Sequence, residues 1–228
     1  MCGIVGFTGP GIDAAPIVRS MMAPLRHRGP DDERTLIDRR LAVGHLRLTI
    51  VDPIGGRQPR HDPDTGDLLV YNGEIYNYRR HAEALRASGV ALRDVSDTEV
   101  LFQTIRRHGV RGAVERLDGM FAFAYRDGAT GTVTLARDRF GEKPLFYAVR
   151  DGRLVFASEL KGLLRHPACA APAIDLQAVG EYLAFDYVPA GGTGIAGIAK
   201  LRPAHLLEFA DGAGVETCLL YTSPSPRD

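Results

Sequence analysis

The sequence predicts an α+β protein in which antiparallel sheets pack on each other and helices lie outside them. Strand-like and helical segments come in separate runs, and residues 119–158 hold four successive strand-like segments with Asp127-Gly128 and Asp151-Gly152 at turns. Asp-Gly between strands is typical of a tight hairpin, and hairpins build antiparallel sheets. A doubly wound parallel sheet would instead need strands and helices that alternate.

Three further strands are expected in the first third of the chain. Their segments are rich in apolar and β-branched residues and are bounded by Gly, Pro and Asp: residues 2–8, 41–51 and 68–76. The first of these starts at the very beginning of the chain, so we expect the fold to hold the N-terminus in place.

Helices are predicted where apolar residues recur at helical spacing behind a capping residue. The strongest start is Ser96 with Glu99 at capping-box spacing, in a helix that runs to Gly109. The other three are expected from Asp13 to Leu25, over residues 77–89 with Gly89 ending the helix, and from Asp175 onward.

Composition excludes several classes of protein. The 28 basic and 28 acidic side chains cancel, so no net field attracts nucleic acid or an anionic membrane. No apolar run approaches the roughly 20 residues that span a bilayer, and we expect a cytoplasmic protein. The three cysteines lie far apart without metal-ligand spacing, which predicts neither a disulfide framework nor a metal site.

Cys2, directly after the initiator methionine, is the first candidate for chemistry. Initiator methionine is normally removed before a small residue, which here would place a free α-amine beside the thiol. An α-amine titrates near 7.7–8.0 and a free thiol near 8.5, so this nucleophile would carry its own general base. Taken alone, Cys2 is better explained as a small residue that permits methionine removal.

Several motifs occur together with Cys2 and change that balance. In chain order they are MCGIVGF, RHRGPD at 26–31, GHLRLTIVD at 44–52, NGEIYN at 72–77 and SDTE at 96–99. This set resembles the glutaminase domain of class II glutamine amidotransferases, a family of N-terminal nucleophile (Ntn) hydrolases. LARDRFGEKPLFY at 135–147 and FASELK at 156–161 resemble the asparagine synthetase branch. The resemblance spans roughly residues 2 to 210 and implies a four-layer αββα sandwich of two antiparallel sheets.

The resemblance implies three catalytic groups. Cys2 would attack the side-chain amide of glutamine, and the Asn72 side chain with the Gly73 backbone N–H would stabilise the resulting oxyanion. In isolation, Asn72-Gly73 reads as a turn. We expect this pair to follow a strand, with glycine allowing close approach and an unusual backbone angle.

The resemblance also implies a set of substrate-binding residues. Arg47 would pair with the α-carboxylate of glutamine, and Asp97 and Glu74 with its α-ammonium. Alone, Arg47 would be a surface arginine and Asp97 a helix N-terminal acid. The backbone next to Arg47 is expected at the rim of the pocket, at Leu48, Ile50 and Val51.

Two further segments have implied roles. Residues 28–31 would form a loop that shapes the pocket and orders on glutamine binding. The charged run Arg137, Asp138 and Arg139 is expected to be structural, with its members paired to each other or facing a partner domain.

The resemblance divides the chain into parts. Residues 2–165 are predicted as the glutaminase domain and 166–210 as a linker and the start of an incomplete synthetase domain. Residues 218–228 resemble translated adapter sequence and are expected to be a non-native tail. We find no Ser-Gly-Gly-x-Asp-Ser pyrophosphate loop, so ATP and Mg are expected only for the missing synthetase domain, and no cofactor for this chain.

The implied function is glutamine hydrolysis that supplies ammonia to an asparagine synthetase domain. L-glutamine and that domain are the expected partners, and a homodimer is possible. Two alternatives stay open: a synthetase-like amidotransferase with another acceptor, and a non-catalytic glutamine-binding module.

Overall fold

Two antiparallel sheets form the centre of the computed structural model, which describes residues 1–49, 52, 55–189 and 191–218. In the described chain, the first sheet has the order β10 (Ala199–Lys200), β8 (Phe146–Arg150), β9 (Arg153–Ala157), β1 (Gly3–Thr8), β3 (Leu41–Arg47), β2 (Asp32–Ile37). The second has the order β12 (Ala213–Cys218), β11 (His205–Ala210), β7 (Val133–Arg137), β6 (Gly119–Arg126), β5 (Leu68–Ile75), β4 (Arg60–His61).

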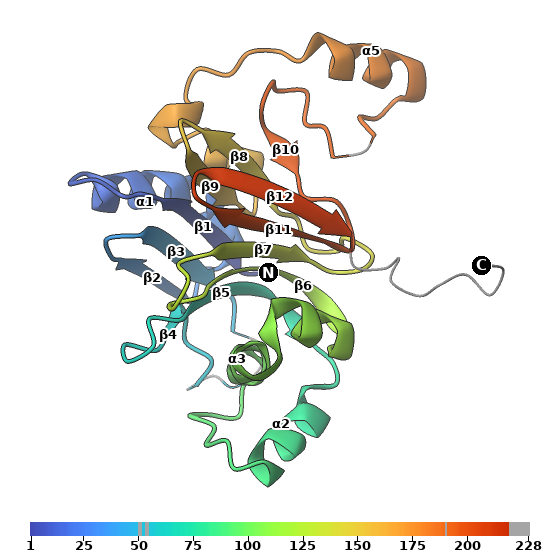
Figure 1. The fold of residues 1–228 in the computed structure, drawn as a ribbon. Helices are drawn as coiled ribbons and strands as arrows, with labels where there is room; N and C mark the ends of the chain where they lie inside the picture. The colour runs from blue at the N-terminus through green and yellow to red at the C-terminus, as the bar shows by residue number, and fades with distance from the viewer. Residues whose placement is uncertain (50–51, 53–54, 190, 219–228) are drawn as a thin grey trace, which may run out of the picture.

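Helices cover the outer face of each sheet (Figure 1). On the first sheet lie α1 (Ala14–Met22), the 3₁₀ helix η1 (Ala23–Arg28) and α4 (Leu160–Leu163), whose apolar side chains pack with β1, β3 and β9. On the second sheet lies α3 (Asp97–Arg116), with α2 (Tyr78–Ala87) against it. The predicted four-layer αββα sandwich is confirmed.

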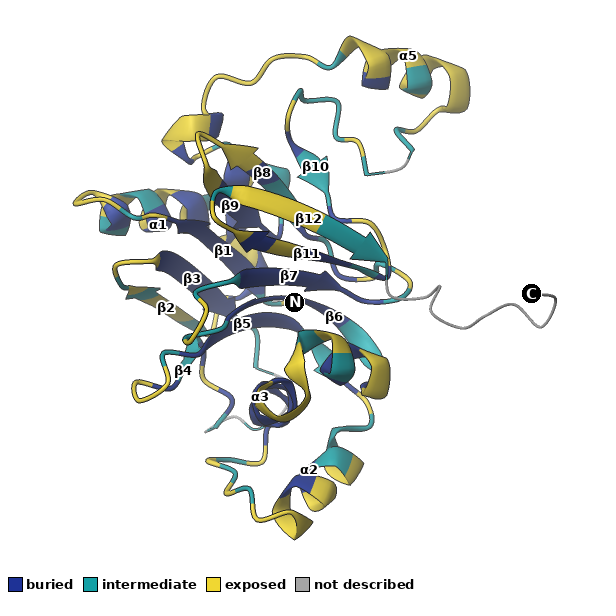
Figure 2. Cartoon of the chain, viewed as in Figure 1, coloured by how far each residue is buried: buried dark blue, intermediate teal, exposed yellow. Residues whose placement is uncertain are grey.

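The core lies between the two sheets. Residues of β1, β3 and β9 meet residues of β5, β6 and β7 in one apolar cluster, and these strands are buried along almost their whole length (Figure 2). Gly44 in β3 allows α1 to approach closely, because a Cβ there would lie 2.3 Å from the Met22 sulfur. The first residues of the chain therefore enter the most buried part of the first sheet.

The predicted helices are present. The Ser96 hydroxyl accepts a hydrogen bond from Glu99 N at 3.1 Å, and α3 kinks at Gly109, where φ is +71°. Asp175 caps α5 (Leu176–Phe185) by accepting from Gln177 N and Ala178 N. Asp13 precedes α1 without a side-chain cap.

The predicted turns have different outcomes. Asp151 and Gly152 form a two-residue hairpin between β8 and β9, with φ of +50° and +67°. The tight hairpin expected at Asp127-Gly128 is wrong, because β6 and β7 are joined by a six-residue loop over 127–132. There Asp127 accepts from Thr130 N at 2.8 Å. In addition, β6 and β7 belong to one sheet and β8 and β9 to the other.

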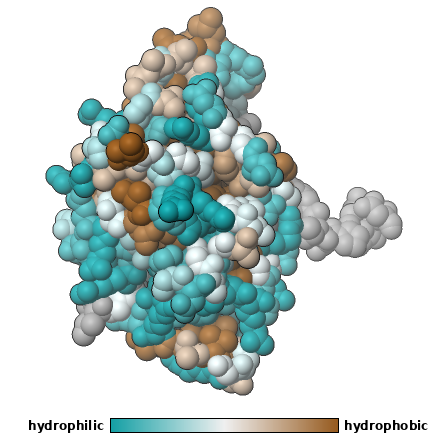
Figure 3. Space-filling view, turned by 60° about the vertical axis from the view of Figure 1, so that its left-hand side comes forward, coloured by the Kyte–Doolittle hydropathy of each residue, from teal (hydrophilic) through white to brown (hydrophobic). Residues whose placement is uncertain are grey.

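The last part of the described chain extends both sheets. β10 pairs with β8 and β11 pairs with β7, so a segment that we assigned to a linker and the next domain contributes strands here. The domain division itself stays a prediction. Between η2 (Pro167–Cys169) and β10, α5 leaves apolar side chains exposed at the top of the molecule (Figure 3). The tail over 219–228 lies outside the described residues.

Candidate active site

Cys2 is held at the start of β1 by neighbours from three segments. Its Sγ lies 3.4 Å from Leu48 N, which donates to it. The Arg28 Nε donates to the Cys2 carbonyl at 3.0 Å, and Arg28 Nη1 pairs with Glu159 Oε1 at 2.7 Å. Burial raises the pKa of the Cys2 thiol, against the lowering effects of the Leu48 N–H and of Arg47. The backbone of the candidate nucleophile is therefore fixed by an ion-paired arginine.

A single pocket brings the candidate site residues together. Of the nine residues proposed from the sequence, seven line it: Cys2, Arg47, Leu48, Asn72, Gly73, Glu74 and Asp97. Ile50 and Val51 lie outside the described residues. Segments more than 90 positions apart in the chain thus meet around the thiol.

Asn72 presents an unpartnered amide to this pocket. Its side chain is 1% exposed, and its Nδ2 has no hydrogen-bond partner among the described residues. Buried amide groups nearly always have partners, because an unmade hydrogen bond there costs about 1–3 kcal/mol. A ligand oxygen in the pocket would supply the missing acceptor.

Gly73 differs from its sequence-based interpretation. Asn72 and Gly73 lie inside β5, which agrees with the strand predicted over 68–76 but not with the expectation that the pair follows a strand, and the backbone of Gly73 is not in the left-handed region. Glycine is needed there for space, because a Cβ would lie 2.3 Å from the Met120 carbonyl oxygen on β6. Pairing with β6 overrides the local preference of Asn-Gly for a turn.

Asp97 contributes a buried carboxyl group to the lining of the pocket. Its Oδ2 accepts from the Tyr71 hydroxyl at 2.8 Å and from Ile75 N at 3.1 Å. Burial raises the pKa of this carboxyl despite these two donors. A bound cation would offset the cost of burying the ionised carboxylate, as expected for an ammonium site.

Arg47 lines the same pocket from the C-terminal end of β3. It is 7% exposed, and its Nη2 donates to the carbonyls of Asp52 and Gly55, each at 2.7 Å. Two carbonyls on one nitrogen fix the plane of the guanidinium. A planar group of fixed orientation is suited to recognise a carboxylate.

His45 and Gln58 support the strand that carries Asn72. The Tyr71 carbonyl accepts from Gln58 Nε2 at 3.0 Å, and His45 Nε2 lies 3.2 Å from the same oxygen. Because a carbonyl can only accept, this His45 nitrogen carries the proton. Burial lowers the pKa of His45 to about 4, so the ring is neutral at ordinary pH.

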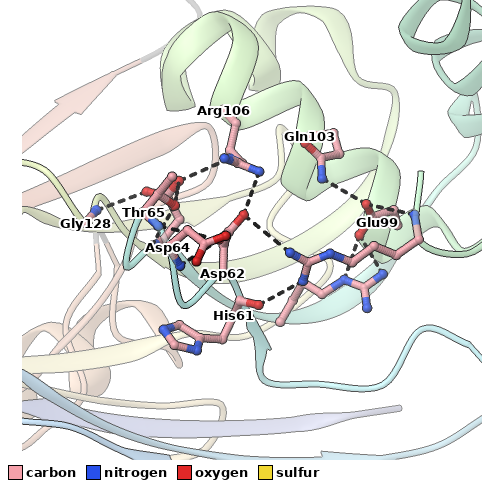
Figure 4. A network of polar contacts seen from close by, with 11 residues as sticks. His61, Asp62, Asp64, Thr65, Glu99, Gln103, Arg106 and Gly128 are labelled. Atoms are coloured by element: carbon pink, nitrogen blue, oxygen red, sulfur yellow. Dashed lines mark hydrogen bonds and ion pairs between the residues drawn. The ribbon is translucent and has the colours of Figure 1, made fainter. Parts of the chain in front are cut away.

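An ion-pair network anchors the first turns of α3, which begins at Asp97 (Figure 4). Arg60 on β4 binds Glu99 Oε2 at 2.7 Å and Asp94 at 2.5 Å, and Gln103 donates to Glu99 at 2.9 Å. Further along the helix, Arg106 pairs with Asp62 and Asp67. These contacts tie α3 to β4 and β5 and thereby hold Asp97 beside the pocket.

The charged run after β7 is structural, as expected, but its members do not pair with each other. Arg137 donates to the carbonyls of Lys143 at 2.8 Å and Leu201 at 2.6 Å. Asp138 accepts from four backbone N–H groups, among them those of Phe121 and Lys143. The two buried charges shape a loop whose Lys143 reaches the pocket.

Sequence reasoning missed six other residues after Met1 that line the pocket: Gly56, Gln58, Tyr71, Thr98, Met120 and Lys143. Tyr71 and Thr98 adjoin proposed residues, so their position was a usable signal. Gln58 and Met120 carried none, because only the packing of separate strands brings them here. Lys143 lay within a motif to which we gave a structural role.

The described residues form neither a metal-binding cluster nor a membrane-spanning helix. In the part of the chain that the structure describes, no three His, Cys, Asp or Glu side chains are grouped so that they could hold a metal ion. No described helix is both long and apolar enough to cross a membrane.

Comparison with known proteins agrees with the geometry. A family model described as a glutamine amidotransferase domain matches residues 1–219. The chain belongs to this family. The chain is 37% identical over 222 residues to asparagine synthetase [glutamine-hydrolyzing] 3 of Bacillus subtilis, which covers 94% of this chain and 36% of the relative. It is 36% identical over 199 residues to the Gallus gallus asparagine synthetase, covering 84% and 35%. The chain thus spans about a third of the length of these relatives.

Solved structures support the fold. The glutamine phosphoribosylpyrophosphate amidotransferase of B. subtilis superposes with a TM-score of 0.69 at 21% identity, covering 97% of this chain and 50% of that one. A second structure, titled as the allosteric regulatory enzyme of purine biosynthesis, matches with the same TM-score at 22% identity. The predicted resemblance to the amidotransferases is confirmed.

Proposed function

We propose that this domain hydrolyses L-glutamine to glutamate and ammonia, with Cys2 as an N-terminal nucleophile. The observation that carries the proposal is the unpartnered Asn72 amide in the pocket that contains the Cys2 thiol. An oxyanion that develops next to Cys2 would provide the acceptor that this amide lacks. The family match and the asparagine synthetase relatives support the same reaction.

The first half of the reaction forms a thioester. Removal of Met1 exposes the Cys2 α-amine, which accepts the thiol proton as Sγ attacks the side-chain amide carbon of glutamine. Asn72 Nδ2 and the Gly73 N–H donate to the oxyanion of the tetrahedral intermediate. When the intermediate collapses, the C–N bond breaks, the amine returns the proton to the leaving nitrogen, and ammonia departs.

The second half uses the same groups in reverse. Water loses a proton to the α-amine and attacks the thioester carbon, and Asn72 and Gly73 again hold the oxyanion. The C–S bond then breaks, Cys2 recovers its proton, and glutamate leaves.

Substrate recognition would rest on the charged residues that line the pocket. Arg47 pairs with the α-carboxylate, while Asp97 and Glu74 pair with the α-ammonium, so the side-chain amide points to Cys2. Leu48, Ile50 and Val51 border the ligand through main-chain groups. In this scheme Met1 occupies part of the site until it is removed, since it lines the same pocket.

In the whole protein, the ammonia would amidate aspartate in a synthetase domain that uses ATP and Mg. The names of the relatives support this acceptor. Another carboxylate acceptor and a non-catalytic glutamine-binding module are the alternatives. We further propose that the protein acts in the cytoplasm and forms a homodimer, and that this domain itself needs no cofactor or metal.

The decisive test is peptide mapping and glutamate release with Cys2→Ala and the matched control Cys169→Ala, which removes a buried thiol outside the pocket. We expect a Met1-free chain, one adduct on Cys2 from a glutamine-mimicking diazo-ketone, and hydrolysis lost only in Cys2→Ala. Hydrolysis that survives in Cys2→Ala would refute the nucleophile. Absence of both adduct and hydrolysis in the folded, Met1-free chain would favour the non-catalytic module.

A further inference from the structure

Lys143 places a positive charge in the pocket for which the proposed mechanism has no role. It lies between β7 and β8, and its backbone is fixed at both ends: its N–H donates to Asp138 Oδ2 at 3.1 Å and its carbonyl accepts from Arg137 Nε at 2.8 Å. The side chain lines the same pocket as Cys2 and is only 6% exposed. A buried lysine held this firmly has a defined position.

The ammonium of Lys143 has an unusual environment. Its Nζ contacts the Met1 sulfur at 3.4 Å, and no carboxylate of the described chain forms an ion pair with it. A buried charge without a counter-ion is costly, so such groups are seldom present without a role. Removal of Met1 would take away this contact and leave the ammonium facing the vacated space beside Cys2.

Charges of both signs surround the N-terminal amine and the thiol. For the Met1 amine, burial lowers the pKa, as do Arg28 and Lys143, whereas Cys2 and Asp31 raise it. The thiol faces Arg47 and Asp97. Glu74 and Tyr71 complete the titratable groups that line the pocket. Among the described residues no carboxylate forms an ion pair with Lys143, whereas Glu159 forms one with Arg28.

We propose that Lys143 is a positioning residue whose ammonium acts as a fixed counter-charge beside Cys2 and favours the reactive form, with the α-amine unprotonated and the sulfur ready to attack. This inference rests on the proposed function. The positive charge of Lys143 should lower the pKa of both the Cys2 α-amine and the Cys2 thiol, because a nearby cation disfavours an ammonium and favours a thiolate.

The test is the pH dependence of Cys2 alkylation by iodoacetamide in the Met1-free chain, followed by peptide mapping so that Cys169 and Cys218 are counted separately. Lys143→Met keeps the length of the side chain and removes its charge. We expect its alkylation profile to shift upward by about one pH unit, the effect of one charge several ångströms away at an intermediate dielectric. Lys143→Arg retains the charge and should keep the wild-type profile.

Arg80→Gln is the matched control, because it removes one positive charge from an exposed position on α2. Its profile should coincide with that of the wild type. Thermal unfolding of each variant shows that the comparison is between folded proteins. An identical profile for folded Lys143→Met would overturn the inference, and so would a shift of equal size in Lys143→Arg.

The readout separates this inference from the proposed function. Alkylation reports the state of the thiol without turnover. If wild-type hydrolysis depends on Cys2 and Lys143→Met does not shift the profile, only the role of Lys143 fails. If Cys2→Ala still hydrolyses glutamine, the proposed function fails whatever the alkylation profile shows.

Discussion

Replacement of His45 by glutamine should remove a specific acid sensitivity of the fold. His45 is 2% exposed, and burial lowers its pKa from 6.5 to about 4. Between these values the unfolded chain binds a proton that the folded protein excludes. The contribution of His45 is therefore fully present above about pH 6.5 and is lost as the pH falls toward 4.

The size of the effect follows from the two pKa values. Between pH 7 and pH 5, the excess proton uptake of the unfolded state lowers the free energy of unfolding by about 2 kcal/mol. That is a large share of the total stability of a domain, which is about 5–15 kcal/mol. Few carboxylates titrate in this interval, so the histidine should be visible above the background.

Urea unfolding of wild type and His45→Gln at the two pH values measures this difference. Glutamine cannot be protonated and retains an N–H donor for the Tyr71 carbonyl. We expect the wild type to lose about 2 kcal/mol more than the variant on acidification. His108 and His166 also have lowered pKa values, but they are present in both proteins and cancel. Parallel losses in the two proteins would refute the assignment of a neutral, buried His45.

Three other replacements test the site. Asn72→Ala should reduce kcat for glutamine by roughly 10²- to 10³-fold with little change in KM, because an oxyanion donor is lost. Steady-state kinetics measures this, and a change in KM alone would assign Asn72 to binding of the substrate ground state. Gly73→Ala should unfold at clearly lower urea concentration, because its Cβ would lie 2.3 Å from the Met120 oxygen, and wild-type stability would contradict this packing. Glu159→Gln should reduce the loss of unfolding free energy on acidification from pH 4.5 to 2. Burial raises the pKa of Glu159, but Arg28, Lys161 and His27 outweigh burial and lower this pKa to about 2. We expect about 1 kcal/mol after solvent screening, measured by urea unfolding, and an unchanged limb would show that the ion pair is absent in solution.

The residues of the candidate site could be proposed because several recognisable motifs occur together in one order along the chain. Cys2 is fixed by its place in the chain, and Asp97 by the helix start at Ser96. Asn72 and Arg47 each had a simpler local explanation, and only their order along the chain indicated a pocket. The structure then places both on the wall around Cys2.

The parts that could not be predicted depend on contacts between distant segments. Asn72-Gly73 favours a turn locally, yet pairing with β6 keeps both residues in β5. Asp127-Gly128 has the sequence of a tight hairpin, but Gly128 N donates to Asp67 on a separate loop and the connection is longer. Lys143 reaches the pocket because Asp138 holds its loop, a contact that no periodic pattern reveals.

The position of β1 has a consequence for the timing of synthesis. This strand precedes both of its partners in the chain, since it pairs with β3 on one side and with β9 on the other. Residues up to Ala157 must therefore be translated before β1 has both of its neighbours. Until then the Cys2 thiol has no complete sheet behind it, so the growing polypeptide would acquire its reactivity only after residues up to Ala157 have been translated.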